Sequence, residues 1–130
     1  MGFTPIHFTE EDRIFQDQIR RFAEREVAPI ADEIDHEDRF PAEVIPKFGD
    51  LGLLQWSVPE EYGGPEGSLT MLCIAREELA KYSLSLSVMV GENGNGMALP
   101  LLFGGTDAQK AKYFPLLAKG RTLVAFALSE

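Results

Sequence analysis

The sequence predicts an all-helical domain that ends in a single β-strand. Apolar residues recur at helical spacing through most of residues 1–121, whereas residues 122–130 alternate with the period of two typical of a strand. The alternating residues are Val124, Phe126 and Leu128, separated by the small Ala125 and Ala127. A lone strand leaves its backbone groups without partners. We therefore expect residues 122–130 to be the first strand of a β domain that is missing from this chain.

The first expected helix begins after Thr9, because Thr9 and Asp12 have the spacing of a capping box. It should run for roughly 25 residues, which is long for a globular domain. Pro29 removes a backbone donor, so we expect a kink or a break near Ala28. Its apolar face comprises Phe15, Ile19, Phe22, Ala23, Val27 and Ile30.

A second helix is expected to open at Phe40-Pro41, with Pro41 in its first turn and Gly52 as its C-terminal cap. Pro46 would fall inside this helix, where a proline cannot donate the regular backbone hydrogen bond. Residues 59–65 form a turn-rich loop by composition.

Ser68 is the expected N-cap of a third helix that runs to about Tyr82. Residues 83–90 alternate with period two, which is the pattern of a strand. They lie among helices with no strand nearby to pair with, so we predict a helix. Thr106 and Gln109 form a second capping box, and Gly120 should end the helix that follows.

The expected helices predict which of several side chains are buried and which lie on a polar face. We expect the lone Cys73 to be a buried small hydrophobic residue, and Glu78 to lie on a polar face. The expected core residues near the C-terminal end are Met97, Leu99, Leu101, Leu102, Phe103, Tyr113, Phe114 and Leu117.

Composition limits the class of protein. Hydrophobic residues make up 45% of the chain, enough for a core, and the net charge is -9, all of it from residues 1–61. Nucleic acids and anionic membranes require a positive surface, so neither is an expected partner. No apolar run reaches the length of a membrane span, the start has no leader pattern, and a single cysteine fits a reducing compartment. We predict a cytoplasmic protein.

The residues offer no catalytic apparatus of their own. His7 and His36 are far apart, and no Cys/His set has metal-ligand spacing, so we assign no catalytic residue and no metal site. Residues 91–96 are rich in Gly and Asn but lack the context of a phosphate-binding loop. These small residues allow close approach of either a neighbouring helix or a ligand.

The order of seven short motifs resembles the N-terminal domain of the acyl-CoA dehydrogenase family. The motifs are Glu26-Val27-Ala28-Pro29, Phe40-Pro41, Leu51-Gly52-Leu53-Leu54, Val58-Pro59-Glu60-Glu61-Tyr62-Gly63-Gly64, Glu77-Glu78-Leu79-Ala80, Phe103-Gly104-Gly105-Thr106-Asp107-Ala108-Gln109-Lys110 and Phe126-Ala127-Leu128-Ser129-Glu130. The resemblance implies a helical domain at 1–121, then a β domain that begins at 122–130 and a C-terminal helical bundle.

It also implies the activity. The family uses FAD to convert an acyl-CoA thioester to a trans-2-enoyl-CoA, and its electrons usually pass to an electron-transferring flavoprotein. Phe126, Leu128 and Ser129 would approach the flavin, so the FAD site is only partly present here. The acyl pocket would be lined by Val90, Gly91, Asn93 and Gly94. The family's catalytic carboxylate lies in the missing part, so this chain alone should be inactive.

Two alternatives remain open at this point. The same fold serves flavin-dependent oxidases and monooxygenases, and a non-catalytic helical interaction domain could share it. For the whole protein, the resemblance implies a dimer or a tetramer of identical subunits.

Overall fold

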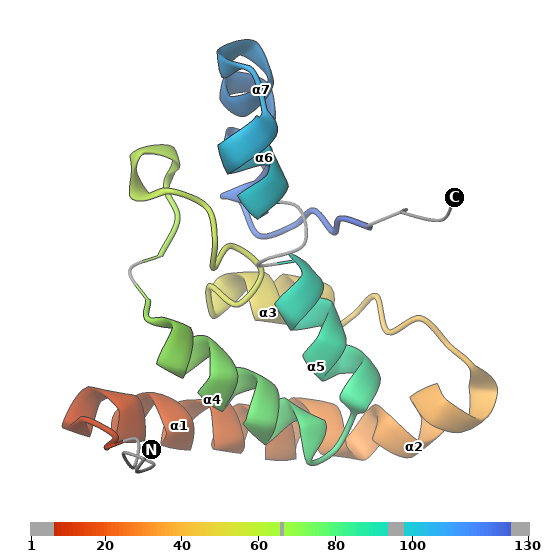
Figure 1. Ribbon diagram of the computed structural model, residues 1–130. Coiled ribbons are helices and arrows are strands. Elements are labelled where there is room, and N and C mark those ends of the chain that lie inside the picture. The colour runs from red at the N-terminus through yellow and green to blue at the C-terminus, as the bar shows by residue number, and fades with distance from the viewer. Residues whose placement is uncertain (1–6, 66, 94–97, 126–130) are drawn as a thin grey trace, which may run out of the picture.

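The computed structural model describes residues 7–65, 67–93 and 98–125 (Figure 1). All regular secondary structure in these residues is helical, which confirms the all-helical prediction. The elements are α1 (Glu10–Phe22), η1 (Ala23–Val27), α2 (Ala28–Glu37), α3 (Ile45–Asp50), η2 (Glu60–Tyr62), α4 (Leu69–Ala80), α5 (Leu84–Gly91), α6 (Ala98–Gly104) and α7 (Asp107–Leu117).

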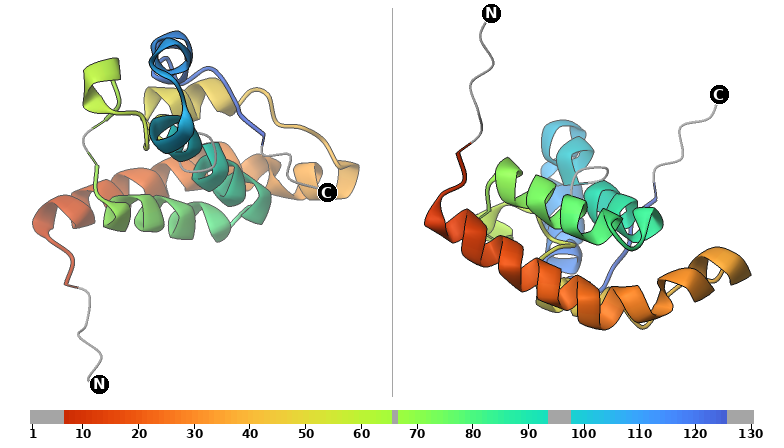
Figure 2. Two further views of the ribbon diagram at one scale, coloured as in Figure 1. Left: turned by 45° about the horizontal axis from the view of Figure 1, so that its top comes forward. Right: turned by 90° about the horizontal axis from the view of Figure 1, so that it is seen from below.

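Helices α1, η1 and α2 follow one another as a single bent rod along one side of the molecule (Figure 2, right). The predicted capping box is present, with Thr9 accepting from the Asp12 N–H and the Asp12 carboxylate accepting from the Thr9 N–H. η1 is a π-helical turn, in which the Ala28 N–H donates to the Ala23 carbonyl. The wider turn lies immediately before Pro29, which has no N–H to donate. The expected irregularity near Ala28 is thus confirmed.

Helix α3 begins at Ile45, later than predicted, because Phe40-Pro41 precedes a series of turns and not a helix. Pro46 is thereby placed in the first turn, where no intrahelical donor is required. Gly52 ends the helix with a φ of +74°, as expected of a glycine cap. The Leu53 N–H bonds the Phe48 carbonyl at 3.0 Å, and the Gly52 N–H bonds that of Gly49 at 3.1 Å, which is the Schellman pattern.

Helices α4 and α5 form a hairpin that packs on the rod through α4 (Figures 1 and 2). Each helix has the serine cap that its first turn requires: Ser68 accepts from the Met71 N–H, and Ser83 accepts from the Leu86 N–H. The prediction that residues 83–90 are helical is confirmed. Their period-two pattern places apolar residues on two opposite faces of α5.

The described residues bury two apolar clusters. The main core joins the rod, α3, α4 and α5, with Ile19, Phe48, Leu79 and Leu86 fully buried in it. The second core lies under α6 and α7, which stand apart from the hairpin in Figure 1. Its members are Val58, Ala98, Leu101, Phe114 and Leu117.

Three expected environments were wrong. Cys73 is exposed, because α4 turns Leu72, Ala75 and Leu79 toward the core and Cys73 away from it. Phe103 is 83% exposed, and both Leu99 and Tyr113 are exposed, because α6 and α7 bury only the faces that carry Leu101, Phe114 and Leu117. Glu78, expected on a polar face, is buried.

Candidate functional site

The residues predicted to approach a flavin, Phe126, Leu128 and Ser129, lie outside the described residues, as does Gly94. The described part of the expected strand, residues 122–125, has no regular secondary structure. No strand among the described residues is available to pair with it. The strand therefore stays a prediction, and so does the boundary between the two expected domains.

The segment 121–125 is nevertheless held firmly by the helical domain. Arg121 donates from Nη1 to the Pro46 carbonyl at 2.9 Å, and from Nη2 to the Asp50 carboxylate. Leu123 packs against the main core, and Val124 packs against the second core. The segment thus crosses from one core to the other before the chain reaches the expected flavin residues.

Asn93 connects this segment to the helices. Its side chain is only 3% exposed. Its Oδ1 accepts from the Val124 N–H at 2.8 Å, and its Nδ2 donates to the Leu54 carbonyl at 2.8 Å. The amide of Asn93 therefore bonds two stretches of chain that are distant from it in the sequence.

The two other described residues of the predicted acyl pocket also face the protein. Val90 is fully buried in the main core. A Cβ on Gly91 would lie 2.7 Å from the guanidinium carbon of Arg76, so glycine allows Arg76 to lie against α5. For Gly91 the packing interpretation of the small residues is thus supported by the structure. Their place in an acyl pocket stays a prediction.

The outward face of α5 carries a different set of residues, which the sequence reasoning missed. Leu86 and Val90 face the core, whereas Leu84, four positions before Val88, is 70% exposed, and Val88 is exposed as well. The signal was available in the period-two pattern, because alternate residues of a helix lie on nearly opposite faces. A helix with two apolar faces is expected to pack on both of them.

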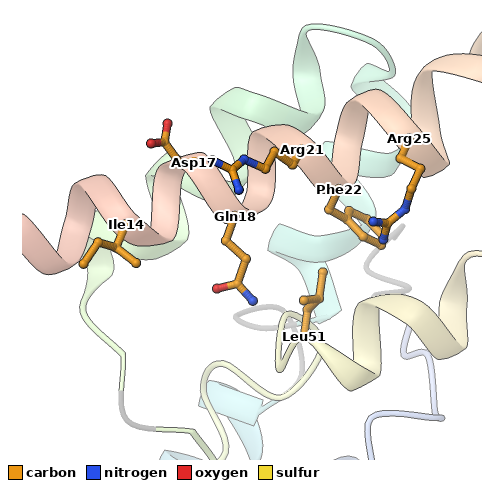
Figure 3. A pocket seen from close by; sticks show the side chains of 7 residues that line it. All are labelled: Ile14, Asp17, Gln18, Arg21, Phe22, Arg25 and Leu51. Atoms are coloured by element: carbon orange, nitrogen blue, oxygen red, sulfur yellow. The ribbon is translucent and has the colours of Figure 1, made fainter.

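A groove of about 490 Å³ lies between the rod and the end of α3 (Figure 3). Gln18 and Phe22 extend from α1 toward Leu51 at the end of α3. Arg21 has no ion-pair or hydrogen-bond partner among the described residues, whereas Arg25 pairs with Glu26 at 2.6 Å. The lining combines the apolar Ile14, Phe22 and Leu51 with charged and amide side chains, and it contains no histidine, cysteine or hydroxyl group. Its residues are Ile14, Asp17, Gln18, Arg21, Phe22, Arg25 and Leu51.

Glu78 is the more deeply buried of two buried carboxylates among the described residues, the other being the capping residue Asp12, and its contacts do not suit a general base. Burial raises its pKa, but hydrogen bonds from Arg20 and Lys81 outweigh burial and hold the pKa below its ordinary value. Gln16 donates a further hydrogen bond at 2.9 Å. A carboxylate with a lowered pKa and several donors is a poor acceptor for a substrate proton.

In residues 7–65, 67–93 and 98–125 no group of three or more His, Cys, Asp or Glu residues could hold a metal ion. No described helix is long and apolar enough to cross a membrane.

Comparison with known proteins assigns these features to a family. The profile of the family described as "Acyl-CoA dehydrogenase, N-terminal domain" matches residues 9–121. The short-chain specific acyl-CoA dehydrogenase of Clostridium acetobutylicum is 38% identical over 125 residues, which cover 96% of this chain and 33% of that relative. The chain spans about a third of the length of the curated relatives it matches.

Solved structures agree with the sequence relatives. Butyryl-CoA dehydrogenase from Megasphaera elsdenii superposes with a TM-score of 0.85 at 31% identity, covering 98% of this chain and 34% of that chain. A chain in the structure described as the electron transferring flavoprotein of Acidaminococcus fermentans superposes with a TM-score of 0.81 at 30% identity, covering 92% of this chain and 32% of that chain.

Proposed function

Because the chain belongs to the acyl-CoA dehydrogenase family, as its N-terminal domain, we propose that the whole protein oxidises an acyl-CoA thioester to the trans-2-enoyl-CoA. The reaction removes the α-hydrogen as a proton and the β-hydrogen as a hydride. When bound, FAD would supply the hydride acceptor. The carboxylate base would come from the part of the protein beyond this chain, because Glu78 is already held by Arg20 and Lys81.

The geometry of α5 carries this proposal. The helix exposes an apolar face at Leu84 and Val88, and the side chain of Asn93 just beyond its C-terminal end holds Val124. The exposed apolar face of α5 and the contact to segment 121–125, which leads to the proposed flavin residues, therefore lie along one stretch of chain. A thioester needs this combination, since its acyl chain is apolar and its reacting carbons must reach the flavin.

In this proposal the stretch from Val90 to Gly94 forms the inner end of the acyl pocket, with Gly91 and Asn93 between them. The side chains of Val90 and Asn93 face the protein, so they would shape the pocket from behind. Direct contact with the acyl chain would come from the exposed face of α5, at Leu84 and Val88.

The described residues fit FAD in a supporting role. Segment 121–125 is anchored at Arg121 and Val124 and leads directly to the residues proposed to contact the flavin. Those residues are Phe126, Leu128 and Ser129. Aromatic and aliphatic side chains suit the apolar ring system, and a serine hydroxyl suits its polar edge.

We propose an electron-transferring flavoprotein as the electron acceptor. In support, a chain of this fold is part of a structure described as such a flavoprotein. The proposal also includes a cytoplasmic location and a dimer or tetramer of identical subunits.

The proposal is tested with the whole protein carrying its flavin. Anaerobic titration with acyl-CoA esters of short, medium and long chains should bleach the visible flavin absorbance with at least one of them. Mass spectrometry should then find a product that is two hydrogens lighter than its substrate. Bleaching by none of the esters would overturn the dehydrogenase proposal.

Rapid reoxidation of the reduced flavin by oxygen, with formation of peroxide, would instead identify an oxidase. Rapid reoxidation by an electron-transferring flavoprotein, with slow reaction toward oxygen, is the expected result.

A further inference from the structure

We infer that Asn93 is a positioning residue for segment 121–125, which leads to the proposed flavin contacts and which Asn93 holds by accepting the Val124 N–H. This inference rests on the proposed function, because the flavin contacts at Phe126, Leu128 and Ser129 are part of that proposal. It assigns to the Asn93 side chain a role other than contact with the acyl chain.

Both functional groups of the Asn93 amide are used within the protein. Oδ1 accepts from the Val124 N–H and Nδ2 donates to the Leu54 carbonyl, each at 2.8 Å. A primary amide is the uncharged side-chain group that donates and accepts at two fixed positions. With the residue 3% exposed, an amide turned toward a ligand would leave the Leu54 carbonyl and the Val124 N–H without these bonds.

The Val124 nitrogen, which Asn93 binds, lies at a position that affects which way the side chains of the expected strand face. In a strand, alternate residues share a face and direct their N–H groups to the same edge. Val124 therefore shares a face with Phe126 and Leu128 in the expected strand. A slip of one residue would turn all three side chains to the opposite face. The bond from Asn93 to Val124 opposes such a slip.

The same bond limits where a β ladder can begin. The Val124 N–H is already taken by Asn93, so it cannot also bond a neighbouring strand. On that edge a ladder of the expected strand can therefore begin only beyond Val124. Asn93 would thus fix the boundary between the helical domain and the β domain, next to the proposed flavin contacts.

The experiment compares two variants of the whole protein. Asn93→Leu removes both hydrogen bonds and keeps the same branched arrangement of heavy atoms. Ser87→Ala is the matched control, because Ser87 is also a buried polar residue of α5 that bonds one backbone carbonyl, that of Arg76 at 2.8 Å. The control side chain has no bond to segment 121–125.

Two readouts separate positioning from stability. In Asn93→Leu, hydrogen exchange at the Val124 amide should accelerate at least about tenfold, and the dissociation constant of FAD should rise roughly tenfold with an altered flavin circular dichroism spectrum. In Ser87→Ala both should stay within about twofold of the wild type, even where the melting temperature falls equally.

Unchanged Val124 exchange and unchanged FAD affinity in Asn93→Leu would overturn the inference, as would equal changes in Ser87→Ala. If Asn93→Leu does not fold, Asn93→Ser takes its place, because the shorter side chain stays polar but cannot reach both partners. A wild-type protein that binds no FAD would instead overturn the proposed function, and the Val124 exchange arm would still show whether Asn93 holds the segment.

Discussion

The Glu78 carboxylate lies 3.2 Å from the Arg20 guanidinium, which joins α4 to α1 across 58 positions of the sequence. Glu78 is 1% exposed, whereas Arg20 reaches solvent. Lys81 and Gln16 complete the set of donors around this carboxylate. Helices α1 and α4, which pack against each other in the main core, are therefore also joined by a buried charge.

Removing this carboxylate should destabilise the protein. For Glu78→Ala we expect the free energy of unfolding to fall by roughly 1.5–3 kcal/mol, the range for hydrogen bonds to a charged group. Arg20 and Lys81 are partly exposed and can be rehydrated, which limits the loss. Urea denaturation of the variant measures the change. Glu77→Ala, on the exposed side of α4, is the control and should stay within about 0.5 kcal/mol. Equal effects of the two variants would contradict the role of Glu78.

The contribution of Glu78 should depend on pH. Its folded-state pKa is lowered from the ordinary 4.5, so the unfolded chain binds the proton at higher pH than the folded chain does. The stabilisation is thus complete above about pH 4.5 and is lost as the pH falls through the lower, folded-state pKa. Hydrogen bonds from Lys47 and Arg39 also lower the pKa values of Glu26 and Glu43, which act in the same direction.

Comparison of the wild type with Glu78→Gln isolates this effect, because glutamine cannot titrate. Unfolding is measured from about pH 7 down to about pH 3. The wild type should lose more stability on acidification, so the gap between the two proteins narrows. A gap that is independent of pH would show that Glu78 has no shifted pKa.

Replacing Gly49 by alanine should destabilise the protein, whereas the same replacement of Gly104 should not. A Cβ on Gly49 would lie 1.9 Å from the Gly120 carbonyl oxygen, where α3 meets the turn after α7. Gly49→Ala should therefore cost roughly 1–3 kcal/mol or more, since the clash is with backbone. Gly104, at the end of α6, has no atom within 4 Å of such a Cβ, and Gly104→Ala should be nearly neutral. Thermal denaturation measures the melting temperatures of the two variants. Equal melting temperatures would contradict the close contact between Gly49 and Gly120.

A charge on the outward face of α5 should impair the proposed activity of the whole protein. Leu84→Glu is expected to lower kcat/KM for an acyl-CoA thioester by roughly tenfold or more, because it would place a carboxylate against the apolar acyl chain in the proposed pocket. Leu69→Glu is the matched control, since Leu69 is also 70% exposed but lies on α4. The control should keep its kcat/KM. A similar loss in both variants would argue that the effect comes from charge or folding and not from the α5 face.

The sequence by itself determined where α1, α4 and α7 begin and where α3 ends. Thr9, Ser68 and Thr106 were each predicted as caps, and each accepts the N–H three residues later. Gly52 likewise ends α3 as predicted. These signals are readable because the interacting groups lie within one turn of each other, so no distant part of the chain can change them. The family resemblance rests on the same kind of short, local motif.

The tertiary structure alone decided which way each helix faces and what its polar residues bond. Cys73 and Glu78 lie on the same helix, yet the thiol is exposed and the carboxylate is buried, because α1 packs on one side of α4 only. Asn93 was singled out from the sequence, but its partners Leu54 and Val124 are 39 and 31 residues away. Hydrogen bonds over such separations depend on how the helices pack, and packing is a property of the assembled chain that no local pattern encodes.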